Sequence, residues 1–196
     1  MGSKFGGAAS WANIALSVAA FAVGVAIVGK GGGGGADAIV AGAPLLLFSE
    51  GLKLGIGLCI AVQVSALSGL IPGLTPRLVG FISAILMIAA GLIGLAALLF
   101  PDFRALGAYV NPVALASVAA SGIWALICTI AARKARLFPT WLTIAGALLP
   151  LPSLAALIWP AAGFGAFIVG LLWNRGLALI LGRRRDAADG QSLTPL

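Results

Sequence analysis

Residues 77–100 read RLVGFISAILMIAAGLIGLAALLF and lie between Pro76 and Pro101, with one charged side chain, Arg77, at the start. An α-helix rises about 1.5 Å per residue, so about 20 apolar residues cross a hydrocarbon core about 30 Å thick. This stretch predicts a transmembrane helix, and comparable apolar runs extend over most of the chain.

The composition indicates a protein that lies almost entirely within a membrane. Of its 196 residues, 61% are hydrophobic and 9% are charged, and the mean hydropathy is +1.15. A soluble domain is about 45–50% apolar and about 25% charged, whereas a disordered chain combines low hydrophobicity with high charge. Both classes are excluded, and we predict an all-α polytopic integral membrane protein with six helices in one bundle.

The apolar runs and the residues that interrupt them set the expected domain organisation. One transmembrane domain spans residues 1–182, with helices at about 11–29, 49–70, 77–100, 111–132, 140–159 and 161–181. We expect an interfacial segment at 38–48, a flexible glycine linker at 31–35 and a short cytoplasmic tail at 183–196. The prolines at 150 and 152 should break or kink the fifth helix, because proline removes a backbone hydrogen bond.

Basic residues predict the orientation of the chain. With six membrane crossings, the basic residues divide unequally between the two sides of the membrane. One side receives Lys4, Arg77, Arg133, Lys134, Arg136 and Arg183 to Arg185, and the other receives Lys30, Lys53 and Arg104. Short cytoplasmic loops carry an excess of Lys and Arg. We therefore expect a multi-pass protein of the bacterial inner membrane with both termini in the cytoplasm. The net charge of +7 does not indicate nucleic-acid binding, because the charges lie at the ends of apolar runs.

The residue types that are missing argue against catalysis. The chain has no histidine and five acidic residues, so the commonest general base and metal ligand is absent and paired carboxylates are scarce. The two cysteines, Cys59 and Cys128, lie in apolar runs and are interpreted as small packing residues. We expect no enzymatic site, no metal and no cofactor.

Three polar residues of the second helix form a candidate intramembrane site. Glu50 and Lys53 are three residues apart and share a helix face, and Gln63 lies deeper in the same helix. Ionisable groups inside a membrane are costly and often functional. The alternative is that Glu50 is favoured by the helix N-terminus while Lys53 extends to the interface, and that Gln63 forms interhelical hydrogen bonds.

A second candidate site lies at the end of the last helix. Arg175 interrupts the apolar run, and Arg183, Arg184 and Arg185 follow it. Long basic side chains extend toward headgroups, so these arginines are a candidate contact for anionic lipids.

Three local strings resemble a bacterial six-helix membrane protein family of unknown function. They are Ser49-Glu50-Gly51-Leu52-Lys53-Leu54-Gly55, Pro76-Arg77-Leu78-Val79-Gly80, and Leu137-Phe138-Pro139 through Ala145-Gly146. This chain has Lys53 where the family pattern has arginine. The resemblance implies six helices and no mechanism.

Three functions remain open from the sequence. The first, which we predict, is a non-catalytic accessory or scaffold subunit of a larger membrane assembly that binds a membrane-protein partner or forms a homo-oligomer. The second is a small transporter or channel, because discontinuous helices often form transport sites. The third is a membrane binder of a lipid or another hydrophobic small molecule.

Overall fold

The chain folds into a bundle of α-helices. The computed structural model describes residues 2–29, 36–159 and 161–191, and this part contains helices and connecting turns but no strand. The elements are α1 (Gly2–Gly29), α2 (Ala36–Ser68), α3 (Leu74–Leu99), the 3-10 helix η1 (Pro101–Tyr109), α4 (Val110–Lys134), α5 (Thr140–Leu148), α6 (Pro150–Ala155) and α7 (Ala162–Gln191). Five spans in the described residues are long and apolar enough to cross a membrane. The predicted all-α polytopic membrane bundle is confirmed.

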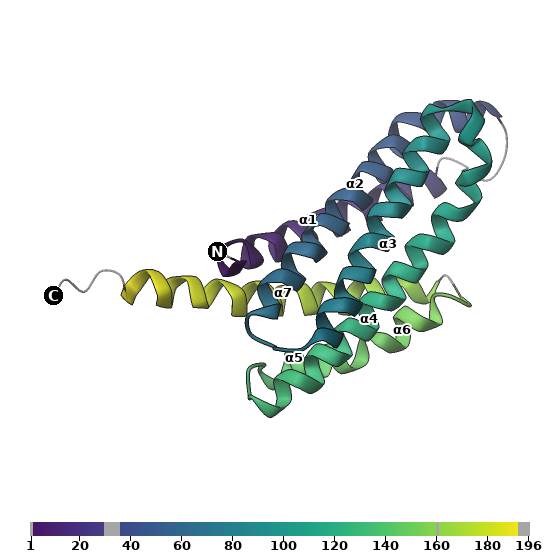
Figure 1. Ribbon diagram of the computed structural model, residues 1–196. Helices are drawn as coiled ribbons and strands as arrows, with labels where there is room; N and C mark the ends of the chain where they lie inside the picture. Colours follow the sequence, from purple (N-terminus) through teal and green to yellow (C-terminus); the bar gives the residue numbers. More distant parts are fainter. Residues whose placement is uncertain (1, 30–35, 160, 192–196) are drawn as a thin grey trace.

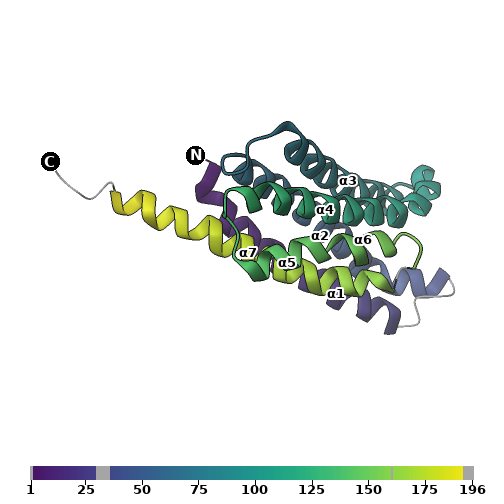
Figure 2. The same cartoon turned by 90° about the horizontal axis from the view of Figure 1, so that it is seen from below.

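The helices are arranged as a closed ring in which α1 to α4 alternate in direction, α5 and α6 together run opposite to α4, and α7 runs opposite to α5 and α6 (Figures 1 and 2). Each of α1, α2, α3 and α4 packs against the next, α5 and α6 follow α4, and α7 returns to pack against α1 (Figures 1 and 2). Gly6 near the start of α1 lies against Leu181 near the end of α7. We call this the terminal end of the bundle, and the opposite end, where η1 lies, the far end (Figure 1).

The second helix differs from the prediction. Residues 38–48 do not form a separate segment, because α2 runs without interruption from Ala36 to Ser68 and includes Pro44. In lipid, every backbone polar group needs a partner within the protein, so continuing the helix past one proline leaves fewer groups unpaired than ending it. The predicted linker at 31–35 lies outside the described residues.

The fifth predicted helix is divided as expected, but it does not unwind. Helix α5 ends at Leu148 and α6 begins at Pro150, and Leu149 between them keeps right-handed helical angles (φ −55°, ψ −36°). Neither Pro150 nor Pro152 has an N–H to donate, while Leu149 and Ser153 still donate to the carbonyls of Ala145 and Leu149. The prolines therefore produce a kink between two short helices that together run beside α4 and α7.

The last helix also extends further than predicted. Its backbone stays helical to Gln191, so the first part of the expected tail continues α7 beyond the bundle (Figure 1). Arg77 at the start of α3 and Arg133 at the end of α4 are exposed at the terminal end, whereas Arg104 of η1 is exposed at the far end.

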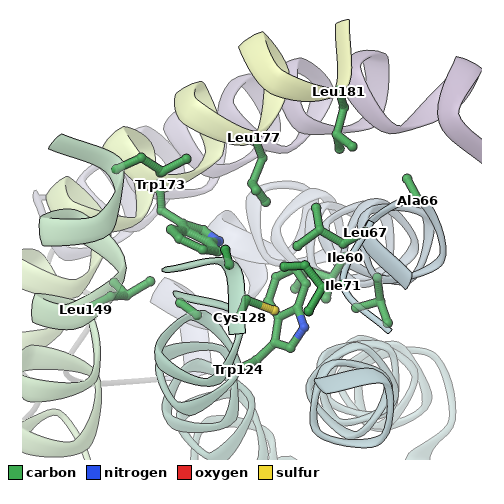
Figure 3. Packing of buried hydrophobic residues seen from close by; sticks show 14 of the residues in the cluster. Ile60, Ala66, Leu67, Ile71, Trp124, Cys128, Leu149, Trp173, Leu177 and Leu181 are labelled. Carbon is green, nitrogen blue, oxygen red and sulfur yellow. The ribbon is translucent and has the colours of Figure 1, made fainter. Parts of the chain in front are cut away.

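Buried large side chains gather in the half of the bundle nearer to the terminal end. Figure 3 shows Trp124 of α4 and Trp173 of α7 in this core, packed edge to face with ring centroids 6.3 Å apart. Leu177 and Leu181 extend the core along α7. The side chains of this buried cluster fill the half of the bundle nearer to the terminal end.

The outward faces of the helices are apolar as well. Exposed large hydrophobic residues occur on every long helix, including Val25, Leu58, Ile85, Ile130 and Leu172. A water-soluble protein rarely exposes so much contiguous apolar surface, whereas lipid tails are a suitable solvent for it. The bundle is therefore compatible with direct contact to a lipid bilayer.

Candidate ligand-binding cavity

A partly open cavity of about 320 Å³ lies between the helices of the ring. Its lining residues come from α1, α2, α3, α4, α6 and α7, together with Leu149 between α5 and α6. Phe21, Leu115 and Phe167 line its part nearer to the far end, and Trp124 and Trp173 separate it from the packed core. The bundle is thus filled in one half and hollow in the other.

Three amide side chains from three helices form one end of this cavity. Gln63 Nε2 of α2 donates to Asn174 Oδ1 of α7 over 2.7 Å, and Asn13 Nδ2 of α1 donates to the same oxygen over 3.2 Å. Asn13 also lies 3.5 Å from Gln63 Oε1. All three residues line the cavity. We call Asn13, Gln63 and Asn174 the amide floor.

Further hydrogen bonds connect the amide floor to its own helices. Ser17 donates to Asn13 Oδ1 over 3.3 Å, and Ser10 accepts from Gln63 Nε2 over 3.1 Å. Asn174 Nδ2 donates to the carbonyl of Gly170 one turn earlier, over 2.9 Å. The side chains are therefore oriented before any ligand binds, which reduces the entropy that binding must remove.

Side-chain size explains why the ring is closed near the terminal end and open near the far end. A Cβ at Gly7 would lie 3.1 Å from Gly182 N and 3.3 Å from the Ala178 carbonyl, so α1 and α7 touch through their backbones there. Toward the far end, Phe21 and Phe167 lie between the same two helices, stacked with ring centroids 4.8 Å apart. Small residues bring helices close and large residues separate them, so the two helices diverge and leave space.

Glu50 and Lys53 form a separate site between α2 and α3. Lys53 Nζ lies 2.6 Å from Glu50 Oε1, and the two side chains are 18% and 8% exposed. Glu50 Oε2 is buried without a hydrogen-bond partner among the described residues. A Cβ at Gly94 of α3 would overlap this carboxylate, so any larger residue at position 94 requires the Glu50 side chain to move.

This placement overturns one explanation offered for Glu50. The residue is not in the first turns of its helix, because α2 begins at Ala36. The favourable field of a helix N-terminus falls off within the first turn, so it does not stabilise this carboxylate. The ion pair with Lys53 is the polar contact that this carboxylate makes.

The three polar residues of α2 do not form one site. Gln63 is 13 residues beyond Glu50, or about 20 Å along the helix axis. Glu50 and Lys53 are absent from the lining of the cavity, whereas Gln63 belongs to it. The expected interhelical hydrogen bonds of Gln63 are present.

A serine cluster links α3 to α4. Ser117 donates to the carbonyl of Ser83 over 2.8 Å, and Ser83 donates to the carbonyl of Ser117 over 3.0 Å. Ser121 also contacts Ser83 and lines the cavity. Ser117 lies outside the lining, so it joins the helices without contributing to the cavity.

Arg175 and the two cysteines are not among the described residues that line the cavity. Arg175 is exposed on α7, and the backbone of Arg183 to Arg185 continues that helix, while their side chains fall outside the described part. Cys128 is buried in the core and Cys59 is half-buried, and both are free thiols. The anionic-lipid contact of these arginines stays a prediction.

Of the three residues of the amide floor, only Gln63 is among the candidates predicted from the sequence, and its contact with Asn13 and Asn174 is seen only in the structure. The feature of the sequence that could have indicated this contact is that all three side chains are amides, which form hydrogen bonds with one another in pairs. The chain matches no family model, and no curated protein and no solved structure matches it.

Proposed function

We propose that this protein binds a small hydrophobic molecule in the cavity between the amide floor and Phe21. The observation that carries the proposal is the cavity of about 320 Å³, lined mainly by apolar side chains with a few convergent amides and hydroxyls. Ligand sites in proteins are typically clefts of about 300–1,000 Å³ with this mixture of lining groups. Among the three functions left open by the sequence, this geometry favours the binder.

The energy of an unfilled cavity supports occupation. Apolar space that no side chain fills leaves the lining residues without contact partners on one side. The surrounding bilayer supplies apolar molecules at high concentration. A molecule that fills the space recovers dispersion contacts that the lining side chains otherwise lack.

Gly170 allows a direct test of occupation. It lines the cavity, and a Cβ at this position would meet no heavy atom within 4 Å, so Gly170→Leu projects into the cavity without displacing backbone. Gly24→Leu is the matched control, because Gly24 is exposed on α1, has equal space for a Cβ and is outside the cavity lining.

Both variants are purified in nanodiscs made from native membranes, and bound molecules are measured by native mass spectrometry. We expect wild type and Gly24→Leu to carry the same bound mass and Gly170→Leu to lose it at least tenfold. Equal retention by all three proteins would contradict the proposal.

The other two functions are less supported by the geometry. A transporter site in a broken helix normally includes unwound backbone, and Leu149 between α5 and α6 remains helical. An accessory or scaffold role stays a prediction, and co-purification of a stable membrane partner under mild detergent would test it. For localisation, the exposed Arg77 and Arg133 support a cytoplasmic terminal end in the inner membrane.

A further inference from the structure

We propose that the ligand is an uncharged amphipathic molecule with one hydroxyl or carbonyl headgroup, bound with that headgroup on the amide floor and its apolar tail toward Phe21 and Phe167. This inference rests on the proposed function and adds the chemical class and the orientation of the ligand.

The lining excludes a charged ligand on energetic grounds. Of the described residues that line the cavity, none is charged, and apart from the two tryptophans its polar residues are amides and serines. Moving an ion from water into such surroundings without a counter-charge is strongly unfavourable. The pair of Glu50 and Lys53 does not supply that charge, because neither residue lines the cavity.

The amide floor retains one open hydrogen-bond donor and one open hydrogen-bond acceptor. Asn174 Nδ2 has two hydrogens and uses one on the Gly170 carbonyl, which leaves one donor. Asn13 Oδ1 accepts one bond, from Ser17, and can accept another. Asn174 Oδ1 is saturated, because it accepts from both Gln63 and Asn13. A headgroup that accepts one hydrogen bond and donates at most one matches these open positions.

The rest of the cavity suits an apolar tail. Asn13 and Phe21 are eight residues apart on α1, which corresponds to about 12 Å along the axis. Between these levels the walls include Ile56, Met87 and Ala166. A medium-length alkyl chain or a slim ring system would contact these walls, and the stacked rings of Phe21 and Phe167 flank its outer end.

The test uses photoreactive probes on the wild-type protein in liposomes. Decan-1-ol, decanoate and decyltrimethylammonium each carry a diazirine at the tail end, and a second decan-1-ol carries it beside the hydroxyl. We expect the alcohol to label the protein at least tenfold more than either ion. Peptide mapping should place the tail-end label near Phe21 and Phe167 and the label beside the hydroxyl near Asn13 and Asn174.

Two variants add a structural check. Asn174→Leu removes the open donor and should lower labelling by the alcohol to the level of the ions. Ser117→Ala removes a buried hydrogen bond between α3 and α4 outside the cavity and should leave labelling unchanged. The wild-type label positions decide the orientation even when Asn174→Leu does not fold.

The outcomes separate this inference from the proposed function. Equal labelling by the alcohol and decanoate, or a reversed position of the two labels, overturns the headgroup assignment. If Gly170→Leu still abolishes labelling in that case, binding in the cavity stands. If Gly170→Leu leaves labelling by every probe unchanged, the proposed function itself is wrong.

Discussion

Gln63 and Asn174 are 111 residues apart in the sequence, and Gln63 Nε2 donates a hydrogen bond of 2.7 Å to Asn174 Oδ1. This bond joins α2 to α7, two helices that are not neighbours in the ring and make few other contacts. It therefore closes the ring across its interior and forms part of the amide floor.

The first prediction concerns the strength of this bond. Gln63→Met and Asn174→Leu should each destabilise the bundle, and a double-mutant cycle should give a coupling energy between the average of about 0.6 kcal/mol and the maximum of about 1.7 kcal/mol for side-chain hydrogen bonds in membranes. Reversible unfolding in mixed micelles measures the free energies. Gln63→Met combined with Ser117→Ala is the control, since these residues share no hydrogen bond and should be additive. A coupling near zero for Gln63 and Asn174 would show that the bond is not formed.

The second prediction concerns the glycine opposite Glu50. Gly94→Ala places a methyl group in the space of the Glu50 carboxylate and should cost about 1–3 kcal/mol, as overpacking does. Gly51→Ala, on the exposed side of α2 where a Cβ meets nothing, should be neutral or slightly stabilising. Thermal unfolding in detergent compares the two. The double variant Gly94→Ala with Glu50→Ala should recover most of the loss, and a failure to recover would place the clash elsewhere.

A third prediction concerns the buried ion pair. Lys53→Met leaves the Glu50 carboxylate without its partner and should destabilise the protein by about 3 kcal/mol, at the low end for buried pairs because Lys53 remains 18% exposed. Combining Lys53→Met with Glu50→Gln removes both charges and should restore most of the stability. The same unfolding measurement checks both proteins. If Lys53→Met alone is as stable as wild type, the pair has no structural role.

The fourth prediction concerns orientation. Gly107→Cys lies in η1 at the far end, and Ala135→Cys follows α4 at the terminal end. Both are made with Cys59 and Cys128 replaced by alanine. On intact cells, a membrane-impermeant maleimide should label Gly107→Cys, whereas Ala135→Cys should react only after permeabilisation. The opposite pattern would place the termini outside the cytoplasm.

Several features could be predicted from individual stretches. The run from Arg77 to Phe100 predicts a helix of nearly the observed extent, Leu74–Leu99, because apolar residues in lipid leave the backbone no partner but itself. The division at Pro150 follows equally directly from the missing N–H. The start of α2 lies earlier than predicted, because the helix includes residues 38–48 with Pro44, and lipid favours a continuous helix over unpaired backbone groups.

The contacts of the candidate site follow less directly from the sequence. Glu50 and Lys53 are three residues apart and their pairing follows from helix geometry. Gln63 was grouped with them because it shares their helix, yet its partners, Asn13 and Asn174, come from α1 and α7. The depth of a residue in the membrane and the rotation of its helix about the axis decide which polar groups come into contact. Both depend on how the whole bundle packs and not on the neighbouring sequence.

The apolar runs and the prolines of this chain are thus enough to predict a polytopic helical membrane protein, the place of its interruption and the polar residues that are available. The closure of the bundle into a ring, the filling of one half by Trp124 and Trp173 and the hollow above the amide floor depend on how the helices pack. These helices are apolar on all sides. Hydrophobic periodicity then does not mark the inward face, and the close approach at Gly7 and the separation by Phe21 set it instead.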